Sequence, residues 1–158
     1  MKTGIISDTH HYLNPLVLKV FHGVDLVLHG GDVGSEEILL QLRTIAPVIA
    51  VKGNMDNEAS LKALPLRCQI EVEDKRIFIT HDIGNIAVFH QKVLAGRIRP
   101  EPDIVVFGHT HQAFYKQLGK VVYINPGSAT SSRDSRKPSV VLLDISPEGE
   151  IAYQLIEL

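Results

Sequence analysis

Short apolar runs alternate with helically spaced segments along the first two thirds of the chain. The runs are short and rich in β-branched side chains, which favours buried strands over helices. Between them, apolar residues such as Leu13, Val17 and Val20 recur three and four positions apart, which predicts amphipathic helices. The predicted strands cover residues 4–7, 24–29, 48–51, 76–80 and 103–107, and the predicted helices cover residues 13–21, 36–45 and 86–99.

Residues at the helix ends support the second and third of these helices. Ser35 is a predicted N-cap, and Glu36 and Glu37 place negative charge in the first turn, where it complements the helix dipole. Pro100 and Pro102 end the third helix, because a residue before proline is disfavoured in helical conformation. The alternation of strands and helices predicts an α/β fold, with a parallel or mixed sheet covered by helices.

The pattern changes to strands joined by tight turns in the C-terminal third. Gly119-Lys120 is typical of a two-residue turn, after a strand at 113–118 and before a strand at 121–124. A similar pattern occurs earlier, with its turn near Glu73-Asp74. The three antiparallel hairpins predicted in this way cover residues 66–80, 113–124 and 139–156.

Length and composition are typical of one globular domain. The chain has 158 residues, of which 44% are hydrophobic and 22% charged, and this is enough to bury a core. No repeat, low-complexity tract or linker divides it, so residues 1–158 are expected to form a single domain. Cys68 is the only cysteine, so the fold does not depend on an internal disulfide. The oligomeric state is left open, and a homo-oligomer is compatible with the sequence.

The charge distribution disfavours a nucleic-acid scaffold role. The formal net charge is -2, and the 16 lysines and arginines are spread along the chain without a basic block. Arg133, Arg136 and Lys137 form a locally basic segment, which is more typical of a solvated loop than of an anion site. The chain opens without a signal-like leader, and no apolar run is long enough to cross a bilayer. A cytoplasmic location without membrane contact is therefore expected.

Side chains that bind metals follow five of the apolar runs directly. Because loops at the carboxyl ends of strands converge on one edge of an open sheet, these side chains are expected to meet there. Any one of them alone is more typical of a turn or a structural histidine, but a shared site explains all five positions together. The predicted metal ligands are Asp8, His10, Asp32, Asn54, His81, His109 and His111.

The spacing of the ligands suggests how they could be distributed between metal ions. Asp8 and His10 are two residues apart, as are His109 and His111, so in extended backbone both members of a pair project to the same side. Each pair can hold one ion or reach two neighbouring ions. The carboxylate of Asp32 has two oxygens and is the candidate bridge between two cations.

The ligand set predicts hydrolysis at phosphorus. These ligands are more numerous than a single tetrahedral zinc needs, so two ions are expected. Oxygen and imidazole donors without thiolate favour manganese, iron, zinc or cobalt over calcium. Two divalent ions about 3.5–4 Å apart can hold a hydroxide and stabilise an in-line displacement at phosphorus. Hydrolysis of phosphate esters by a metal-bridging hydroxide is the predicted chemistry.

The sequence leaves the roles of other polar residues open. His29 ends a strand shortly before Asp32, so it is a candidate to support the metal ligands from behind. The segment 125–128, with the sequence Asn-Pro-Gly-Ser, is either a plain turn or a loop that borders the site. The remaining histidines, which we interpret as structural or exposed, are His11, His22 and His90.

These ordered motifs resemble those of the calcineurin-like metallophosphoesterase superfamily, and in particular its small bacterial and archaeal phosphodiesterase branch. The resemblance covers almost the whole chain. It implies a fold of two mixed β-sheets packed as a sandwich and flanked by α-helices. The motifs are Asp8-Thr9-His10, Gly31-Asp32, Gly53-Asn54, His81, Gly108-His109-Thr110-His111 and Asn125-Pro126-Gly127-Ser128.

The resemblance also implies a division of the ligands between two divalent ions. Manganese is the expected metal, with iron, zinc, cobalt and nickel as alternatives. Asn54 is expected to contact the phosphoester substrate as well. One ion would be bound by Asp8, His10, Asp32 and His111, and the other by Asp32, Asn54, His81 and His109.

Met55 departs from the motif of many relatives, in which a histidine follows the asparagine and protonates the leaving group. A thioether has no proton to donate, so the identity of any catalytic acid stays unknown. Members of the small branch often lack this histidine too. General acid catalysis worth about 10²–10⁴-fold would be missing, which predicts a preference for acidic leaving groups such as those of aryl esters.

Two classes of function are compatible with the sequence. The first is a dinuclear-metal-dependent phosphoesterase, with phosphodiesterase activity favoured over phosphomonoesterase activity. The second is a non-catalytic metal-binding interaction module of the same fold, like the retromer subunit that resembles this family. Relatives in that role have typically lost a ligand histidine, whereas all the ligand histidines are present here, which favours the enzyme.

Overall fold

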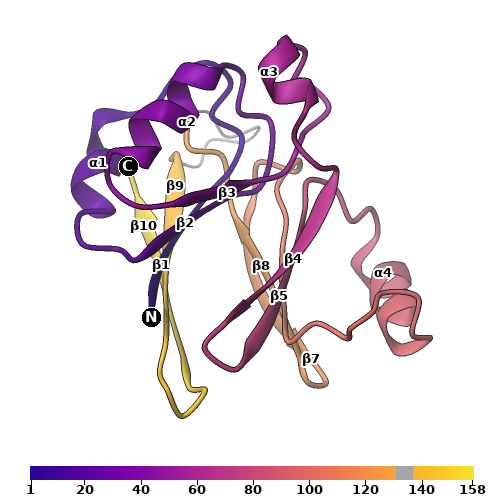
Figure 1. The fold of residues 1–158 in the computed structure, drawn as a ribbon. Helices are drawn as coiled ribbons and strands as arrows, with labels where there is room; N and C mark the ends of the chain where they lie inside the picture. The colour runs from indigo at the N-terminus through magenta and orange to yellow at the C-terminus, as the bar shows by residue number, and fades with distance from the viewer. Residues whose placement is uncertain (131–136) are drawn as a thin grey trace.

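Two mixed sheets face each other in the computed structural model, which describes residues 1–130 and 137–158 (Figure 1). The first sheet contains β1 (Lys2–Ile6), β2 (Leu26–His29), β3 (Val48–Ala50), β9 (Ser139–Ile145) and β10 (Ile151–Glu157). The second contains β4 (Arg67–Val72), β5 (Lys75–Thr80), β6 (Ile104–Val106), β7 (Ala113–Leu118) and β8 (Val121–Pro126). The strand orders are β10-β9-β1-β2-β3 and β4-β5-β6-β8-β7.

Each sheet has a parallel centre and antiparallel additions. β1, β2 and β3 run parallel, β9 pairs antiparallel with the other side of β1, and β10 pairs antiparallel with β9. In the second sheet, β5, β6 and β8 run parallel, while β4 and β7 pair antiparallel at the two edges. All three predicted hairpins are confirmed, and so is the pair of mixed sheets that the resemblance implied.

Period-two alternation along the strands divides the apolar residues into three layers. Ile5 lies in the layer between the two sheets, whereas its neighbour Ile6 faces the helices on the outer side of the first sheet. Those helices are α1 (Pro15–Val20) and α2 (Glu36–Arg43). Phe78 faces outward from the second sheet and packs in the layer of α4 (Ile86–Leu94). α4 lies on the opposite side of the molecule from α1 and α2 (Figure 1).

The third predicted helix ends earlier than its prolines suggested. α4 stops at Leu94, whereas the sequence predicted a helix to residue 99. Gly96 adopts a positive φ of 64°, and the amides of Gly96 and Arg97 bond back to the carbonyls of Val93 and Lys92. This pattern satisfies the last helical carbonyls and terminates the helix. The glycine therefore ends the helix, and the prolines lie beyond the turn.

Other local differences are small. The short helix α3 (Ala59–Lys62) was not predicted. Within the described residues, no helix has the length and apolar character needed to span a membrane. Arg133 and Arg136 of the predicted basic segment lie outside the described residues, and the ammonium of Lys137 is 3.2 Å from the carboxylate of Glu157.

The sandwich changes where the predicted ligands come from. A single open sheet was expected to gather all of them along one edge. Instead, the loops after β1, β2 and β3 belong to the first sheet, and the loops after β5 and β6 belong to the second. The facing sheets present these carboxyl ends together, so the candidate site is shared between both of them.

Candidate metal centre

The structure brings all seven predicted ligands together where the two sheets meet. Asp32 lies between two sets of residues, each with its own short contacts. We call the first set the Asp8 group; it contains Asp8, His10 and His111. We call the second set the Asn54 group; it contains Asn54, His81 and His109.

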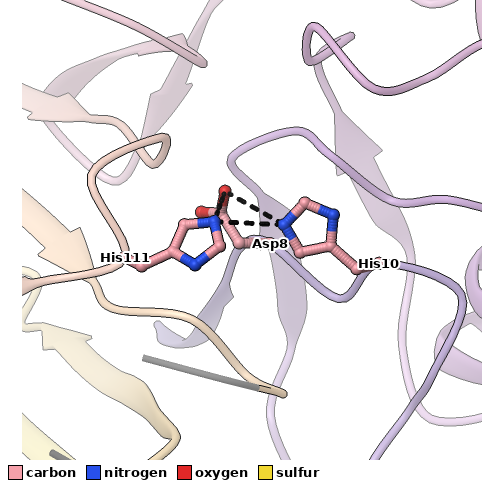
Figure 2. A group of neighbouring side chains, drawn as sticks. All are labelled: Asp8, His10 and His111. Atoms are coloured by element: carbon pink, nitrogen blue, oxygen red, sulfur yellow. Dashed lines mark hydrogen bonds and ion pairs between the residues drawn. The ribbon is translucent and has the colours of Figure 1, made fainter. Parts of the chain in front are cut away.

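In the Asp8 group, two imidazoles converge on one carboxylate oxygen (Figure 2). Asp8 Oδ1 lies 3.2 Å from Nε2 of His111 and 3.9 Å from Nε2 of His10. The two Nε2 atoms are 3.1 Å apart. The three ligand atoms lie within 4.8 Å of one another, a spacing at which one ion can bind all three.

Asp8 provides a physical test of whether this group suits a cation. Its side chain is fully buried, and Oδ1 accepts no hydrogen bond from any described residue. Oδ2 accepts bonds from the Ser7 hydroxyl at 2.6 Å and the His109 amide at 3.1 Å. Burial raises the pKa of Asp8, because the charged form is poorly solvated. A buried oxygen without a donor is costly, and a divalent cation would satisfy it.

In the Asn54 group, an amide oxygen replaces the carboxylate. Asn54 Oδ1 is 3.1 Å from His81 Nε2 and 3.1 Å from His109 Nδ1. His81 Nδ1 is 2.9 Å from the carbonyl of Gly30, and because a carbonyl only accepts, Nδ1 carries the proton. His81 Nε2 faces the oxygens of Asn54 and Asp32. Burial lowers the pKa of His81, but the bond to Asp32 outweighs that effect and raises the pKa, so a proton on Nε2 is favoured until a cation displaces it. His109 instead presents Nδ1 to the site, and its Nε2 is 3.9 Å from Asp82 Oδ2.

Asp32, the candidate bridge, faces both groups. Its Oδ2 is 3.3 Å from His81 Nε2 and 4.0 Å from His10 Nε2, and its Oδ1 accepts a 2.7 Å bond from the Met55 amide. Burial alone would raise the pKa of Asp32, but its bonds with His81 and Met55 outweigh that effect and lower the pKa. Asp8, Asp32 and His81 also form a set of three ligand atoms within 4.8 Å of one another.

The local backbone is not extended, so the geometric reason given for the ligand pairs was wrong. Five of the seven predicted ligands have positive φ, a backbone conformation that residues other than glycine seldom adopt. His109 joins the Asn54 group, and His111 joins the Asp8 group, so this pair is divided between the groups. The residues with positive φ are Asp8 (55°), His10 (43°), Asp32 (53°), His109 (66°) and His111 (59°).

Two glycines are needed because ligand residues approach their backbone closely. A Cβ at Gly53 would overlap the carboxylate and the amide nitrogen of Asp32. A Cβ at Gly108 would overlap the hydroxyl of Ser7 and the carboxylate of Asp8. Each glycine therefore lets a loop from one strand close against the aspartate of another strand.

The 125–128 segment borders the site, which supports the second of its two interpretations. β8 continues to Pro126, so Asn125 belongs to the strand. The Asn125 amide donates to the Gly108 carbonyl at 2.7 Å and the Thr110 hydroxyl at 3.0 Å, fixing the loop that carries His109 and His111. The hydroxyls of Ser128 and Thr130 donate to the Asp8 carbonyl at 2.9 and 2.8 Å.

The sequence reasoning missed Asp56. Its side chain is fully buried, and its two oxygens accept bonds from the Gly34 amide at 2.9 Å and the Gly53 amide at 2.7 Å. It therefore ties the loop after Asp32 to the loop that carries Asn54. The available signal was an aspartate two positions after the Gly-Asn motif, in a segment already expected to turn.

His29 supports the site through the backbone. Its Nδ1 accepts a 3.1 Å bond from the Gly31 amide, so its Nε2 carries the proton and donates to the Thr9 hydroxyl at 3.0 Å. Burial lowers the pKa of His29 to about 3. It therefore stays neutral and holds the segments next to Asp8 and Asp32.

The other histidines follow their interpretation. His11 and His22 are exposed. His90 Nδ1 lies 3.0 Å from the hydroxyl of buried Tyr123, under α4. Burial raises the pKa of Tyr123 to about 12, so this tyrosine stays protonated as a hydrogen-bond donor.

A cavity of about 420 Å³ adjoins the Asn54 group. All three members of the group line it, so it is continuous with the candidate metal centre. Met55 is about half exposed beside Asn54 and offers no proton donor. The other residues that line the cavity are Lys52, Gly53, Leu66, Thr80 and Asp82.

Comparisons with known proteins agree with this geometry. Residues 1–148 match the model of the calcineurin-like phosphoesterase superfamily domain. A probable metallophosphoesterase of Methanothermobacter thermautotrophicus is 36% identical over 153 residues, which cover 94% of this chain and 88% of the relative. A phosphodiesterase of Methanocaldococcus jannaschii is 32% identical over 144 residues, which cover 80% and 83%. The crystal structure of Vps29 from Entamoeba histolytica, complexed with zinc, has a TM-score of 0.77 at 25% identity and covers 99% of both chains.

Proposed function

The chain belongs to the calcineurin-like phosphoesterase superfamily, and on that premise we propose that it is a dinuclear-metal-dependent phosphodiesterase. The observation that carries the proposal is the buried Asp8 Oδ1, which faces two imidazole nitrogens and accepts no hydrogen bond from a described residue. Phosphodiesterase rather than phosphomonoesterase activity is supported by the name of the relative from Methanocaldococcus jannaschii.

The proposed metals are two divalent ions, with manganese as the expected metal. The Asp8 group and Asp32 would hold one ion, and the Asn54 group and Asp32 the other. The distances support this division, because each group has its own short contacts and Asp32 Oδ2 reaches one histidine of each group. When bound, two such ions acidify water and stabilise the charge on phosphoryl oxygens.

The protein's own residues would orient the ester. Asn54 turns its Oδ1 toward the two histidines of its group, which leaves its Nδ2 as a donor for a phosphoryl oxygen. Asp32 stays ionised because its pKa is lowered. Met55 supplies no proton to the leaving group, so the leaving oxygen would depart as an anion or take its proton from solvent.

The likeness to Vps29 favours a second candidate, a metal-binding interaction module without turnover. The ligand set weighs against it in this chain. All four predicted histidine ligands are present, and each lies within 4.0 Å of another predicted ligand. The single-domain extent of residues 1–158 is supported by the family match to residues 1–148. The cytoplasmic location and a homo-oligomer stay predictions from the sequence.

Metal analysis and a substrate panel test the proposal. Protein purified without chelator is expected to carry about two divalent ions per chain and to hydrolyse aryl phosphodiesters faster than aryl monoesters in added manganese. Rates should fall as the leaving-group pKa rises, because no acid is positioned. Asp32→Ala should abolish turnover and lower the metal content. If the loaded protein hydrolysed no diester or monoester, and Asp32→Ala behaved identically, the interaction module would be favoured instead.

A further inference from the structure

The cavity beside the Asn54 group is placed to receive one substituent of the phosphoester. Asn54, His81 and His109 contribute to both the candidate metal centre and the cavity wall. A phosphoryl group held at these residues therefore has one ester arm directed at this space. Its volume of about 420 Å³ falls within the range of small-molecule sites, so an arm the size of an aromatic ring fits.

Lys52 is the unpaired charge of this cavity. Its side chain is only partly exposed, and it forms no ion pair or side-chain hydrogen bond with any residue of the described ranges 1–130 and 137–158. The carboxylate across the cavity, Asp82, is already engaged. Its Oδ1 accepts a 2.7 Å bond from the Gly84 amide, and its Oδ2 faces His109 Nε2 at 3.9 Å.

Leu66 gives the same cavity an apolar wall. Its side chain is 71% exposed, more than any other large hydrophobic side chain of residues 1–130 and 137–158. It lies directly before β4, and its carbonyl is 3.4 Å from the hydroxyl of Thr80, which also lines the cavity. An apolar body of a ligand would cover Leu66 and remove apolar surface from water.

We infer that this cavity is a leaving-group site for esters whose leaving group has an apolar body and an anionic substituent, which Lys52 binds. The inference rests on the proposed phosphodiesterase function and names its substrate class. A lysine next to two divalent ions raises the local positive potential, so an added negative charge on the substrate is favoured there. The phosphodiester itself carries one negative charge, so the second charge must come from the leaving group.

A pair of matched substrates tests the inference in the manganese-loaded protein. One is methyl 4-carboxyphenyl phosphate, and the other is the same diester with the carboxylate masked as a methyl ester. The quantity compared is the ratio of kcat/KM for the charged substrate to kcat/KM for the masked one. Lys52→Ala should lower this ratio about fivefold at low salt, and Lys52→Arg should retain most of it.

Two further variants separate charge from apolar contact. Lys92→Ala removes an exposed lysine of α4 and should leave the ratio unchanged. Leu66→Ala should lower kcat/KM for both substrates by a similar factor, so the ratio should stay close to that of the wild type. High salt should reduce the wild-type ratio toward that of Lys52→Ala, because exposed charges are screened.

The outcomes distinguish this inference from the proposed function. If both diesters are hydrolysed and Lys52→Ala leaves the ratio unchanged, the leaving-group assignment is wrong while the phosphodiesterase stands. If neither diester is hydrolysed by metal-loaded wild type, the proposed function itself fails. A fall in both rates by the same factor with Lys52→Ala would also overturn the charge-recognition role.

Discussion

The Asp8 group and the Asn54 group are built at the same end of the sandwich but in different environments. Their oxygen ligands differ most: Asp8 is fully buried, whereas Asn54 is exposed beside a cavity. Each group also has one buried histidine, His111 or His81, and one partly exposed histidine, His10 or His109. The charged ligand is therefore enclosed, and the neutral amide ligand faces solvent. In the proposed function, the enclosed carboxylate would hold one cation, and the exposed amide would bind the second cation where the substrate arrives.

The two oxygen ligands, Asp8 and Asn54, also differ in the hydrogen bonds that hold them. The Asp8 carbonyl accepts bonds from Ser128 and Thr130, and its carboxylate accepts bonds from Ser7 and the His109 amide. Asn54 is bonded to two histidine side chains through its amide oxygen. The buried carboxylate consequently carries a desolvation cost in the metal-free protein that the exposed amide does not carry.

Substitution of the two oxygen ligands should give the largest losses of hydrolysis, and its effect on metal-free stability should differ between the two groups. Asp8→Asn and Asn54→Ala should both reduce manganese-dependent hydrolysis, Asp8→Asn by more than the roughly 100-fold that loss of a supporting residue costs. Because burial raises the pKa of Asp8 above its unfolded value of 3.8, its ionised form destabilises the fold above that pH. At pH 7, metal-free Asp8→Asn should therefore unfold at a higher temperature than wild type.

Thermal unfolding after removal of metal measures this difference. Asn54→Ala should stay within about 0.5 kcal/mol of wild type, because the residue is exposed. Added manganese at about 100 times its dissociation constant should stabilise wild type by about 2.7 kcal/mol for each ion bound, and Asp8→Asn by less. A metal-free Asp8→Asn protein less stable than Asn54→Ala would contradict the contrast between the two groups.

Asp56 offers a weaker change that acts mainly on the Asn54 group. Its carboxylate holds the amides of Gly34 and Gly53, and Gly53 directly precedes Asn54. Asp56→Ala should weaken manganese binding about 10–100-fold through the loop of Asn54, while Asp8 keeps its own bonds. Isothermal titration with manganese measures the affinity, and one of the two binding steps should be affected more than the other.

The neighbour of this residue provides a matched control. Asn57 is exposed, and among the described residues its side chain donates to the Met55 carbonyl alone, at 3.3 Å, so Asn57→Ala should leave manganese affinity unchanged. Asp56→Ala should also cost about 1–3 kcal/mol of stability, because two buried amides lose their acceptor. A loss of stability without any loss of manganese affinity would show that Asp56 supports only the fold.

The candidate site could be located from sequence because its ligands obey a topological rule. Each follows an apolar run, and strand ends of this kind meet whether one sheet or two supply them. Asp8 and His81 illustrate this, since they come from different sheets and still share a cluster of ligand atoms. The division of the strands between two sheets did not follow from periodicity, because runs buried on both faces look alike in either arrangement.

The details that sequence could not predict are set by tertiary contacts. The positive φ values at His109 and His111 arise where loops from separate strands close on one another, so no local propensity indicates them. Asp56 looked like an ordinary turn residue, because the two amides it binds come from loops distant in sequence. The early end of α4 could have been predicted from sequence, since a glycine such as Gly96 commonly terminates a helix.

His29 offers the smallest and most selective change, because it lies behind the ligands and its hydrogen bonds join it to Thr9 and the Gly31 amide. Its pKa is about 3 in the folded protein against 6.5 for an exposed histidine, so below pH 6.5 the unfolded chain binds a proton that the folded protein excludes. Its contribution to stability is present above pH 6.5 and is lost as the pH falls from 6.5 toward 3. At pH 5 the loss should be about 2 kcal/mol, at 1.36 kcal/mol per unit.

Urea unfolding of the metal-free protein at pH 7 and pH 5 isolates this contribution. His29→Gln keeps a donor and an acceptor but cannot be protonated in this range, so its stability should fall between the two pH values by about 2 kcal/mol less than that of wild type. His22→Gln, at an exposed position, should show the wild-type difference. Equal losses in wild type and His29→Gln would mean that His29 is protonated in the folded state. The Gly31 amide would then face a charged donor, and the support that His29 gives to the segments beside Asp8 and Asp32 would have to come from another residue.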